Sequence, residues 1–166
     1  MSIYKFRASI EGSKVFMREY EVKAGMTLYD FHDYLIGDLD FAPDQMVLFR
    51  GLDAVGNIKS EYGLFDMGDG SMDSVTIEDL LAKKENLFLY VFDVRKDRSI
   101  LFTFVEEVNE HPRASYPRLT AEKGRNPDQF AKRYDDMEQF VESSSYEMKE
   151  DDSIDDEELP EGEEYL

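Results

Sequence analysis

The residues of this chain best suited to acid–base or metal chemistry are two histidines and the carboxylates near them. His32 lies between Asp30 and Asp33, and an imidazole paired with a carboxylate can act as a general base or bind a metal ion. Side chains one or two positions apart on a helix do not face each other, so neither carboxylate is placed to pair with His32. His111 precedes Pro112 in an expected loop. We therefore interpret both histidines as surface or packing residues.

A short acidic stretch, residues 66–73, is similar to part of a calcium-binding loop. An EF-hand loop needs oxygen ligands at alternate positions, a glycine at the sixth position and a glutamate at the twelfth. A loop starting at Asp69 lacks that glycine, and a loop starting at Asp66 fails at its third position. The chain also has no cysteine, which excludes disulfides and cysteine nucleophiles. We expect no catalytic residue, no cofactor and no metal site, and therefore a protein that is not an enzyme.

Negative charge is concentrated at the C-terminal end of the chain. Residues 135–166 hold fifteen acidic residues and one basic residue, Lys149, so they carry −14 of the total net charge of −19. Carboxylates this dense repel one another and offer little apolar area to offset chain entropy. We therefore expect a folded body of one domain, followed by a disordered acidic tail.

Composition also indicates in which compartment the protein is located and which kinds of partner it binds. Residues 1–7 lack the unbroken apolar run of a signal peptide, and no stretch approaches the roughly 20 apolar residues of a membrane span. A pI near 4.4 disfavours nonspecific binding to DNA or anionic membranes and favours a basic protein surface. We expect a cytoplasmic protein that does not bind membranes.

Hydrophobic periodicity predicts the elements that would position any site. Alternation of apolar and polar residues over residues 3–22 predicts a hairpin. Thr27 is a suitable helix N-cap, and Phe31 and Leu35 lie on one face of the helix that should follow it. Gly37 is well placed as the C-cap of this helix. Further along the chain we expect strands at residues 46–49, 62–65, 87–92 and 100–108, and a brief helix that starts at Ser74 or Thr76 and continues through Leu81.

This order of elements is typical of the β-grasp fold. We therefore predict an α+β fold, with a β-grasp-like mixed sheet, one main amphipathic helix across one face, a C-terminal helix and an acidic tail. The predicted domains are a β-grasp-like domain at residues 1–112, a basic connector with a C-terminal amphipathic helix at residues 113–143, and the acidic tail at residues 144–166.

Several motifs resemble a bacterial and archaeal family first named from an open reading frame of an Ri plasmid, also described as insertion-element passenger TnpR-like proteins. Its members share a helix with a leucine-histidine pair, a Tyr-x-Tyr-Asp-Phe-Gly-Asp-x-Trp-x-His-like strand pair, and a Tyr-Pro segment leading into Pro-Pro-Glu-Asp. The resemblance covers about residues 3–130, supports the predicted fold and implies no defined activity. The matching residues are Leu28, His32, Tyr90, Phe92, Asp93, Ile100, Phe102, Phe104, Tyr116, Pro117, Gly124, Pro127 and Asp128.

The chain departs from this family pattern at its polar positions. Arg95 and Lys96 replace the glycine-aspartate pair, Arg98 stands at the tryptophan position and Ile100 at the histidine position. The doubled proline is also absent. The chain therefore lacks the polar residues of the family pattern and retains its apolar residues. The TnpR label suggests a resolvase, but the chain contains no residue set for DNA strand transfer.

A basic stretch precedes the acidic tail and leads into a predicted helix. Asn126 and Pro127 suit the N-cap and first position of a helix over residues 127–143. This helix either docks on the domain or presents its apolar stripe to a partner. The predicted stripe consists of Phe130, Tyr134, Met137 and Val141, and the predicted basic patch consists of Arg113, Arg118, Lys123, Arg125, Lys132 and Arg133.

Apolar residues scattered through the acidic tail extend the predicted partner-binding set. The tail could fold as a short motif on a basic groove, mimic nucleic-acid phosphates, fold back on the basic stretch, or serve only as a solubilising segment. The apolar residues predicted to contact a partner here are Ile154, Leu159, Tyr165 and Leu166.

We predict a non-enzymatic protein-interaction module whose acidic tail engages a basic partner surface. The alternative is a nucleic-acid-binding protein of a mobile element that uses the basic stretch at residues 113–133, with the tail as an autoinhibitor. A third hypothesis is an enzyme with an unrecognised site, which the lack of a titratable cluster disfavours.

Overall fold

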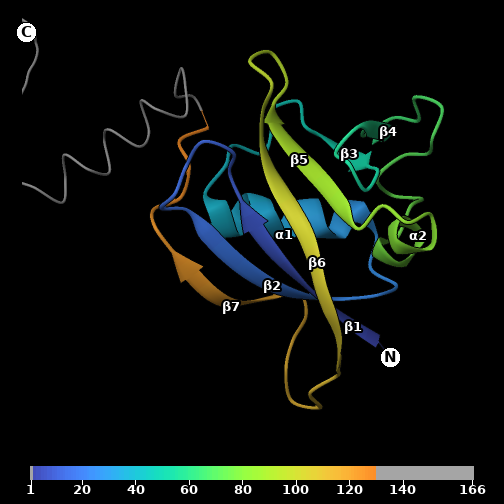
Figure 1. Ribbon diagram of the computed structural model, residues 1–166, viewed down its shortest axis with the longest axis vertical. Helices are drawn as coiled ribbons and strands as arrows, with labels where there is room; N and C mark the ends of the chain where they lie inside the picture. The colour runs from blue at the N-terminus through green and yellow to red at the C-terminus, as the bar shows by residue number, and fades with distance from the viewer. Residues whose placement is uncertain (1, 130–166) are drawn as a thin grey trace, which may run out of the picture. The chain divides into compact units, whose positions relative to one another are not determined.

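The computed structural model describes residues 2–129, and the strands within that range pair into one sheet in the order β4-β3-β5-β6-β1-β2-β7 (Figure 1). The interior position of β5 fits its sequence, which is apolar on both faces. The strands are β1 (Ser2–Ser9), β2 (Met17–Lys23), β3 (Leu48–Leu52), β4 (Ile58–Tyr62), β5 (Leu87–Asp93), β6 (Arg98–Asn109) and β7 (Arg118–Lys123), and the helices are α1 (Leu28–Leu39) and α2 (Ile77–Ala82).

The predicted β-grasp-like mixed sheet with one main helix is wrong. A mixed sheet contains parallel strand pairs, whereas every pairing between the strands of residues 2–129 is antiparallel. Residues 2–129 form mostly antiparallel sheet, and the two helices of this range contribute to the core. The doubly apolar β5 suggested a strand of a parallel or mixed sheet, but it lies between two antiparallel neighbours, β3 and β6. Periodicity identifies strands and does not identify their partners.

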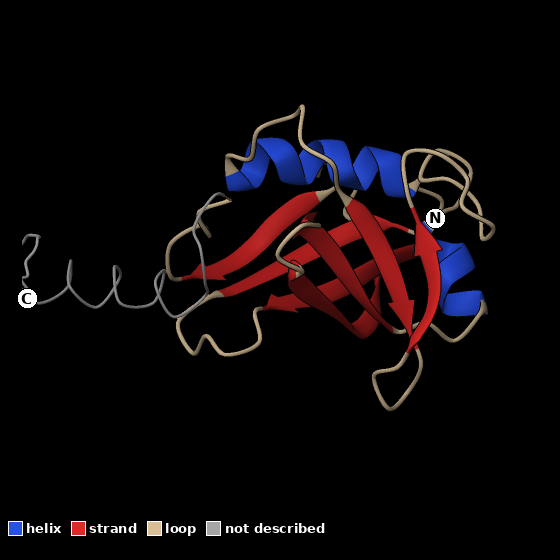
Figure 2. Cartoon of the chain, turned by 90° about the horizontal axis from the view of Figure 1, so that it is seen from above, coloured by secondary structure: helices blue, strands red, loops and turns tan. Residues whose placement is uncertain are grey.

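Aromatic side chains dominate the core between the sheet and the helices. Figure 2 shows α1 beside the curved sheet. The ring of Phe31 on α1 lies 5.3 Å from that of Phe102 on β6 and 6.3 Å from that of Phe49 on β3, measured between centroids. Phe88 and Phe102 stack at 5.2 Å. Such pairs contribute beyond the area they bury, so α1 is fixed firmly to β3, β5 and β6.

Both helices begin after threonine residues that act as N-caps. The Thr27 hydroxyl accepts a hydrogen bond from the amide of Asp30, and Thr76 forms a reciprocal capping box with Asp79 at the start of α2. Helix α1 continues past Gly37 to Leu39, and its C-cap Asp40 adopts a left-handed conformation with φ of 59°. The predicted C-cap, Gly37, is therefore three residues too early.

The C-terminal part of the predicted domain scheme contributes to the sheet. Residues 118–123, within the predicted connector, form β7 and pair with β2. Most of the predicted helix over residues 127–143 lies outside the described residues, as do the acidic tail and the predicted partner-binding residues from Phe130 onward. No helix of residues 2–129 is long and apolar enough to cross a bilayer.

Candidate functional site

The last described segment, residues 123–129, is held by two buried arginines, and we call it the strap. Arg18 on β2 is only 2% exposed. Its guanidinium donates to the carbonyl oxygens of Lys123 (2.8 Å) and Gly124 (3.0 Å) and to the Oδ1 atom of Asn126 (2.7 Å). A buried guanidinium is costly unless its hydrogen-bonding groups are satisfied, so Arg18 and the strap stabilise each other.

Arg98, at the start of β6, holds the other end of the strap. Its guanidinium donates to the carbonyl oxygens of Asp128 (2.6 Å) and Gln129 (2.9 Å). The Asp93 carboxylate lies 3.5 Å from the same guanidinium, which also sits 4.9 Å from the centre of the Phe92 ring. A carboxylate, two carbonyls and an aromatic face together compensate one buried charge.

Side chains of the strap also bind the chain that follows α1. The Gln129 side chain accepts a hydrogen bond from the amide of Ala42 (2.7 Å) and donates to the carbonyl oxygen of Phe92 (3.4 Å). Asn126 donates to the carbonyl oxygen of Asp38 (3.4 Å). The strap therefore links β7, the end of α1 and the end of β5.

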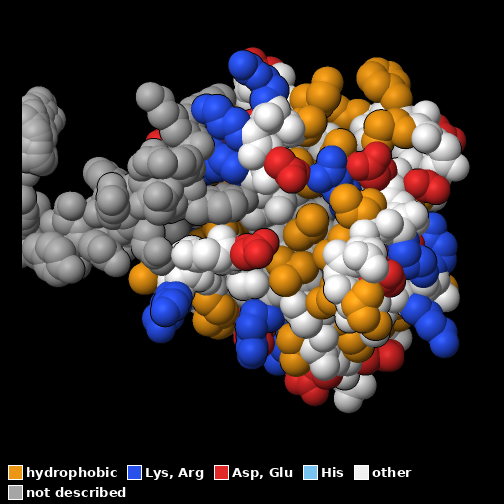
Figure 3. All heavy atoms as spheres, turned by 45° about the horizontal axis from the view of Figure 1, so that its top comes forward, with side chains coloured by type: hydrophobic (Ala, Val, Ile, Leu, Met, Phe, Trp, Pro, Cys, Tyr) orange, Lys and Arg blue, Asp and Glu red, His pale blue; other side chains and the backbone are white. Residues whose placement is uncertain are grey.

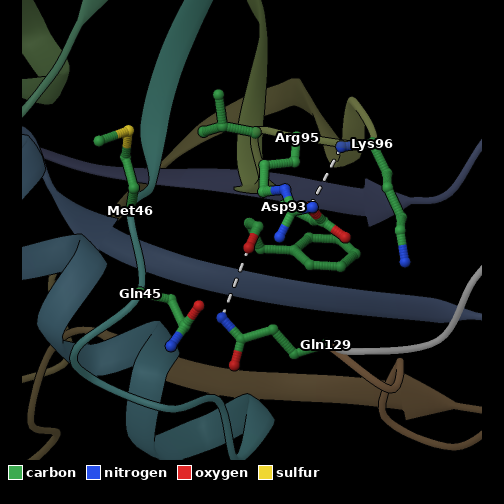
Figure 4. Close-up of a pocket in the computed structure, with 8 residues that line it drawn as sticks. Gln45, Met46, Asp93, Arg95, Lys96 and Gln129 are labelled. Atoms are coloured by element: carbon green, nitrogen blue, oxygen red, sulfur yellow. Dashed lines mark hydrogen bonds between the residues drawn. The ribbon is translucent and has the colours of Figure 1, made fainter.

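A hollow of about 300 Å³ opens beside Gln129 at the end of β5 (Figure 4). Its walls are Gln45, Met46, residues 92–96 and Gln129. Arg95 and Lys96 are exposed there and form no ion pair within the described part of the chain. The Asp93 carboxylate accepts the amide of Lys96 at 3.2 Å, so the one acid of the hollow is already engaged.

A larger groove of about 470 Å³ adjoins the hollow and shares Gln45 and Met46 with it. The groove lies between residues 43–48 and the loop that follows β4. Its exposed apolar side chains are Met46 (71% exposed), Leu64 (44%), Phe65 (83%) and Met67 (52%). Figure 3 shows apolar side chains on the surface, interleaved with charged ones. Flexible thioethers and an aromatic ring at a concave surface can adapt to an apolar partner.

His32 is buried on α1 and takes no part in either cavity. Its Nδ1 atom lies 2.8 Å from the Tyr90 hydroxyl on β5. Burial lowers the pKa of His32, an effect that the charge of Asp33 opposes. Burial also raises the pKa of Tyr90. Two neutral side chains joined by a hydrogen bond form a packing arrangement. His32 is buried, whereas the sequence favoured a solvated residue or one packed at the edge of the core.

Glu85 is another buried titratable group outside the cavities. It has no exposed surface, and its carboxylate accepts the hydroxyls of Ser60 and Tyr62, both at 2.8 Å. These bonds fasten β4 to the turn after α2. Sequence reasoning missed Glu85, because a polar residue between Lys84 and Asn86 carries no local signal of burial.

The acidic loop at residues 66–73 is organised by its own backbone. The Asp66 carboxylate accepts the amides of Gly68 (2.8 Å) and Gly70 (3.0 Å), and these bonds lower the pKa of Asp66. Asp69 accepts the amide of Glu61 (3.0 Å). Within residues 2–129 no three potential metal ligands come together.

The described members of the predicted basic patch lie at separate points along the chain. Arg118 begins β7 and pairs with Glu21 on β2 at 2.8 Å. Lys123 ends that strand, about 16 Å further along at ~3.3 Å per residue, and its carbonyl binds Arg18. Arg113 lies in the turn after β6, Arg125 lies in the strap, and Lys132 and Arg133 fall outside the described residues. The patch stays a prediction.

The groove and the strap were not predicted from the sequence. The sequence placed Leu64 and Phe65 in a strand at residues 62–65, whereas β4 ends at Tyr62 and both side chains are exposed in the loop that follows it. Arg18 carries no local signal of its burial, because an arginine in an alternating strand predicts a solvent-facing position.

The residues that carry the family resemblance meet around the strap and the core. Phe92 and Asp93 both contact Arg98, which departs from the family pattern, and Arg98 in turn donates to the carbonyl oxygen of the strap residue Asp128. His32 reaches Tyr90. Arg98, at the tryptophan position of the family pattern, therefore takes a structural role in holding Asp128 and Gln129.

Comparison with solved structures finds the same fold in a protein of unknown function, MM3350, from Methanosarcina mazei Go1. The two chains are 18% identical, with a TM-score of 0.73 over 88% of this chain and 83% of the other. Identity this low supports a shared fold only. No curated protein matches the chain. The model of one family matches residues 2–161, which confirms the resemblance seen in the sequence, and the chain belongs to the plasmid pRiA4b ORF-3-like protein family.

Proposed function

We propose that this protein is a cytoplasmic, non-enzymatic binding module that docks a partner protein in the groove. One observation carries the proposal: of the eight large apolar side chains exposed in residues 2–129, four line this groove. Single exposed apolar residues are ordinary, whereas a cluster at a concavity is typical of an interaction site. Phe and Met are also enriched where protein interfaces are most buried.

The acidic segment at residues 135–166 adds attraction for a basic partner surface. Its net charge of −14 acts over about a Debye length, ~8 Å at physiological salt, and increases the rate of encounter more than the strength of the final contact. In this proposal the groove selects the partner and the acidic segment attracts it.

Affinity purification from the native cell with matched variants tests the groove. Phe65→Ser removes the most exposed groove side chain, and Val55→Ser is the control, because Val55 is 81% exposed in the turn between β3 and β4 and lies outside the groove. We expect proteins recovered with the wild type and with Val55→Ser to be lost with Phe65→Ser. Equal recovery with all three proteins would exclude the groove as the docking site.

The nucleic-acid alternative receives little support from the described residues. Arg118, in the middle of the basic stretch, is neutralised by Glu21. The alternative requires that a full-length variant with Gln and Asn in place of the acids of residues 147–164 gains affinity for DNA or RNA. A gel shift that detects no binding by this variant would end it.

A further inference from the structure

The groove has an acidic rim. Asp44 lines the groove, and Asp66 lies between its wall residues Phe65 and Met67. The amide of Met72 donates to the carbonyl oxygen of Gly63 (2.8 Å), which brings residues 69–73 beside the same wall. Asp69 and Asp73 lie near this wall without lining the groove, and we count them with Asp44 and Asp66 as its rim.

The four rim carboxylates are exposed, and none of them forms an ion pair with a lysine or arginine of residues 2–129. Three of them are held instead by amides or a hydroxyl: Asp66 by Gly68 and Gly70, Asp69 by Glu61, and Asp73 by Ser71. Hydrogen bonds from neutral donors do not cancel the charge of a carboxylate. The Lys83 ammonium interacts with the charge of Asp69, so the uncompensated charge beside the groove comes mainly from Asp44, Asp66 and Asp73. No basic residue occurs in residues 38–47 or 61–73, the segments that build the groove and its rim.

The rim differs in its ion pairing from another acid nearby, and in the sign of its charge from the hollow. Glu61, on β4, is neutralised by Arg50 at 2.8 Å. The exposed cations Arg95 and Lys96 line the hollow and not the groove. The wall at residues 63–67 therefore combines three exposed apolar side chains with neighbouring carboxylates, most of which have no cationic partner among the described residues.

We infer that the groove accepts a short cationic segment of a partner protein, with apolar side chains inside the groove and Lys or Arg side chains against the acidic rim. The inference rests on the proposed docking function and specifies its partner. Unpaired carboxylates beside an apolar groove attract a cationic segment and repel an acidic one, so the rim supplies specificity while the groove supplies apolar contact. The cationic side chains lie toward residues 63–73, away from Arg95 and Lys96.

The test uses labelled peptides and the full-length protein, with binding followed by fluorescence anisotropy. One peptide combines Leu and Phe with Lys, a second carries Glu in place of Lys, a third carries Gln in place of Lys, and a fourth keeps Lys but carries Ser in place of the apolar residues. We expect the first to bind at least about tenfold more tightly than the second, a difference of ~1.4 kcal/mol or more. The fourth measures attraction to the acidic segment alone.

Two double variants with equal charge change separate the rim from the overall charge. Asp44→Asn with Asp66→Asn removes two of the four rim charges, and the amide side chain introduced by Asp66→Asn keeps an oxygen for the backbone amides of Gly68 and Gly70. Glu11→Gln with Glu107→Gln is the control, because both residues are exposed and distant from the groove segments in the sheet. We expect the rim variant to reduce the preference for Lys over Glu severalfold and the control to preserve it.

The outcomes separate this inference from the proposed function. If the Lys, Gln and Glu peptides bind equally and Phe65→Ser abolishes their binding, the groove is still a docking site. The inferred preference for cations would then be wrong. Binding of the Lys peptide that survives Phe65→Ser would assign it to the acidic segment and also overturn the inference. If none of the apolar peptides binds, both proposals fail at this surface. A dimer seen by sedimentation equilibrium and lost in Phe65→Ser would identify a second copy as the occupant instead.

Discussion

At the scale of single residues, the buried carboxylate of Glu85 leaves no room for a side chain at Gly51 on β3. A Cβ atom at position 51 would lie 2.0 Å from Oε1 of Glu85, and this carboxylate cannot swing away without leaving Ser60 and Tyr62. We expect Gly51→Ala to lower the free energy of unfolding by about 1–3 kcal/mol, measured by urea denaturation.

The matched substitution is Gly37→Ala. No atom lies within 4 Å of a Cβ placed at Gly37, and this residue is inside α1. Alanine is favoured over glycine within a helix by roughly 0.5–1 kcal/mol, so this variant should be stabilised. Destabilisation of both variants by the same amount would contradict the role assigned to Glu85.

His32 makes stability depend on pH. Its folded-state pKa is lowered by burial, so the unfolded chain binds more protons than the folded chain between that pKa and the ordinary value near 6.5. The stability it contributes is present above about pH 6.5 and decreases as the pH falls toward the folded-state pKa. We expect His32→Gln, which can still bond with Tyr90, to show a smaller loss of unfolding free energy between about pH 7.5 and 5.5. An unchanged slope would show that other groups control this range.

At the scale of elements, the strap depends on Arg98. Replacing this arginine by methionine removes the donors that hold the carbonyl oxygens of Asp128 and Gln129. We expect trypsin to cleave after Arg125 much faster in Arg98→Met than in the wild type, because proteolysis requires local release of the backbone. Mass spectrometry of the fragments identifies the cleavage.

Arg7→Met is the control for this experiment. Arg7 is exposed on β1, so its loss should leave cleavage in the strap unchanged. Equal cleavage after Arg125 in the wild type and in Arg98→Met would mean that the guanidinium does not hold the strap.

The sequence predicts elements better than it predicts their assembly. Thr27 and Thr76 cap the two helices because capping depends on residues three positions apart. The pairing of β7 with β2 joins Glu21 to Arg118, and no local pattern encodes a contact across that separation. Asn126 and Pro127 suggested a helix start, but the Asn126 oxygen accepts from Arg18 instead. The Oδ1 atom of Asn126, which could accept a hydrogen bond as a helix N-cap, accepts one from the guanidinium of Arg18.

At the scale of the whole molecule, the concentrated negative charge predicts how partner capture depends on salt. A full-length variant with Gln and Asn in place of the acids of residues 147–164 retains the groove and loses most of the C-terminal charge. We expect it to associate with a basic partner more slowly than the wild type at low salt and at a similar rate at high salt. Surface plasmon resonance at two ionic strengths measures both rates. Equal association rates at low salt would exclude a steering role for this segment.

The position of the strap has a consequence for synthesis on the ribosome. Arg18 is translated early, yet the carbonyl oxygens that surround its guanidinium belong to Lys123 and Gly124. Until residues 123–129 have been synthesised, the Arg18 guanidinium has no carbonyl partners from the strap and stays in water. The side of β2 that carries Arg18 therefore stays unburied until then. Completion of the fold is therefore tied to the appearance of residues 123–129, and premature termination before them should yield a product that quality-control proteases recognise.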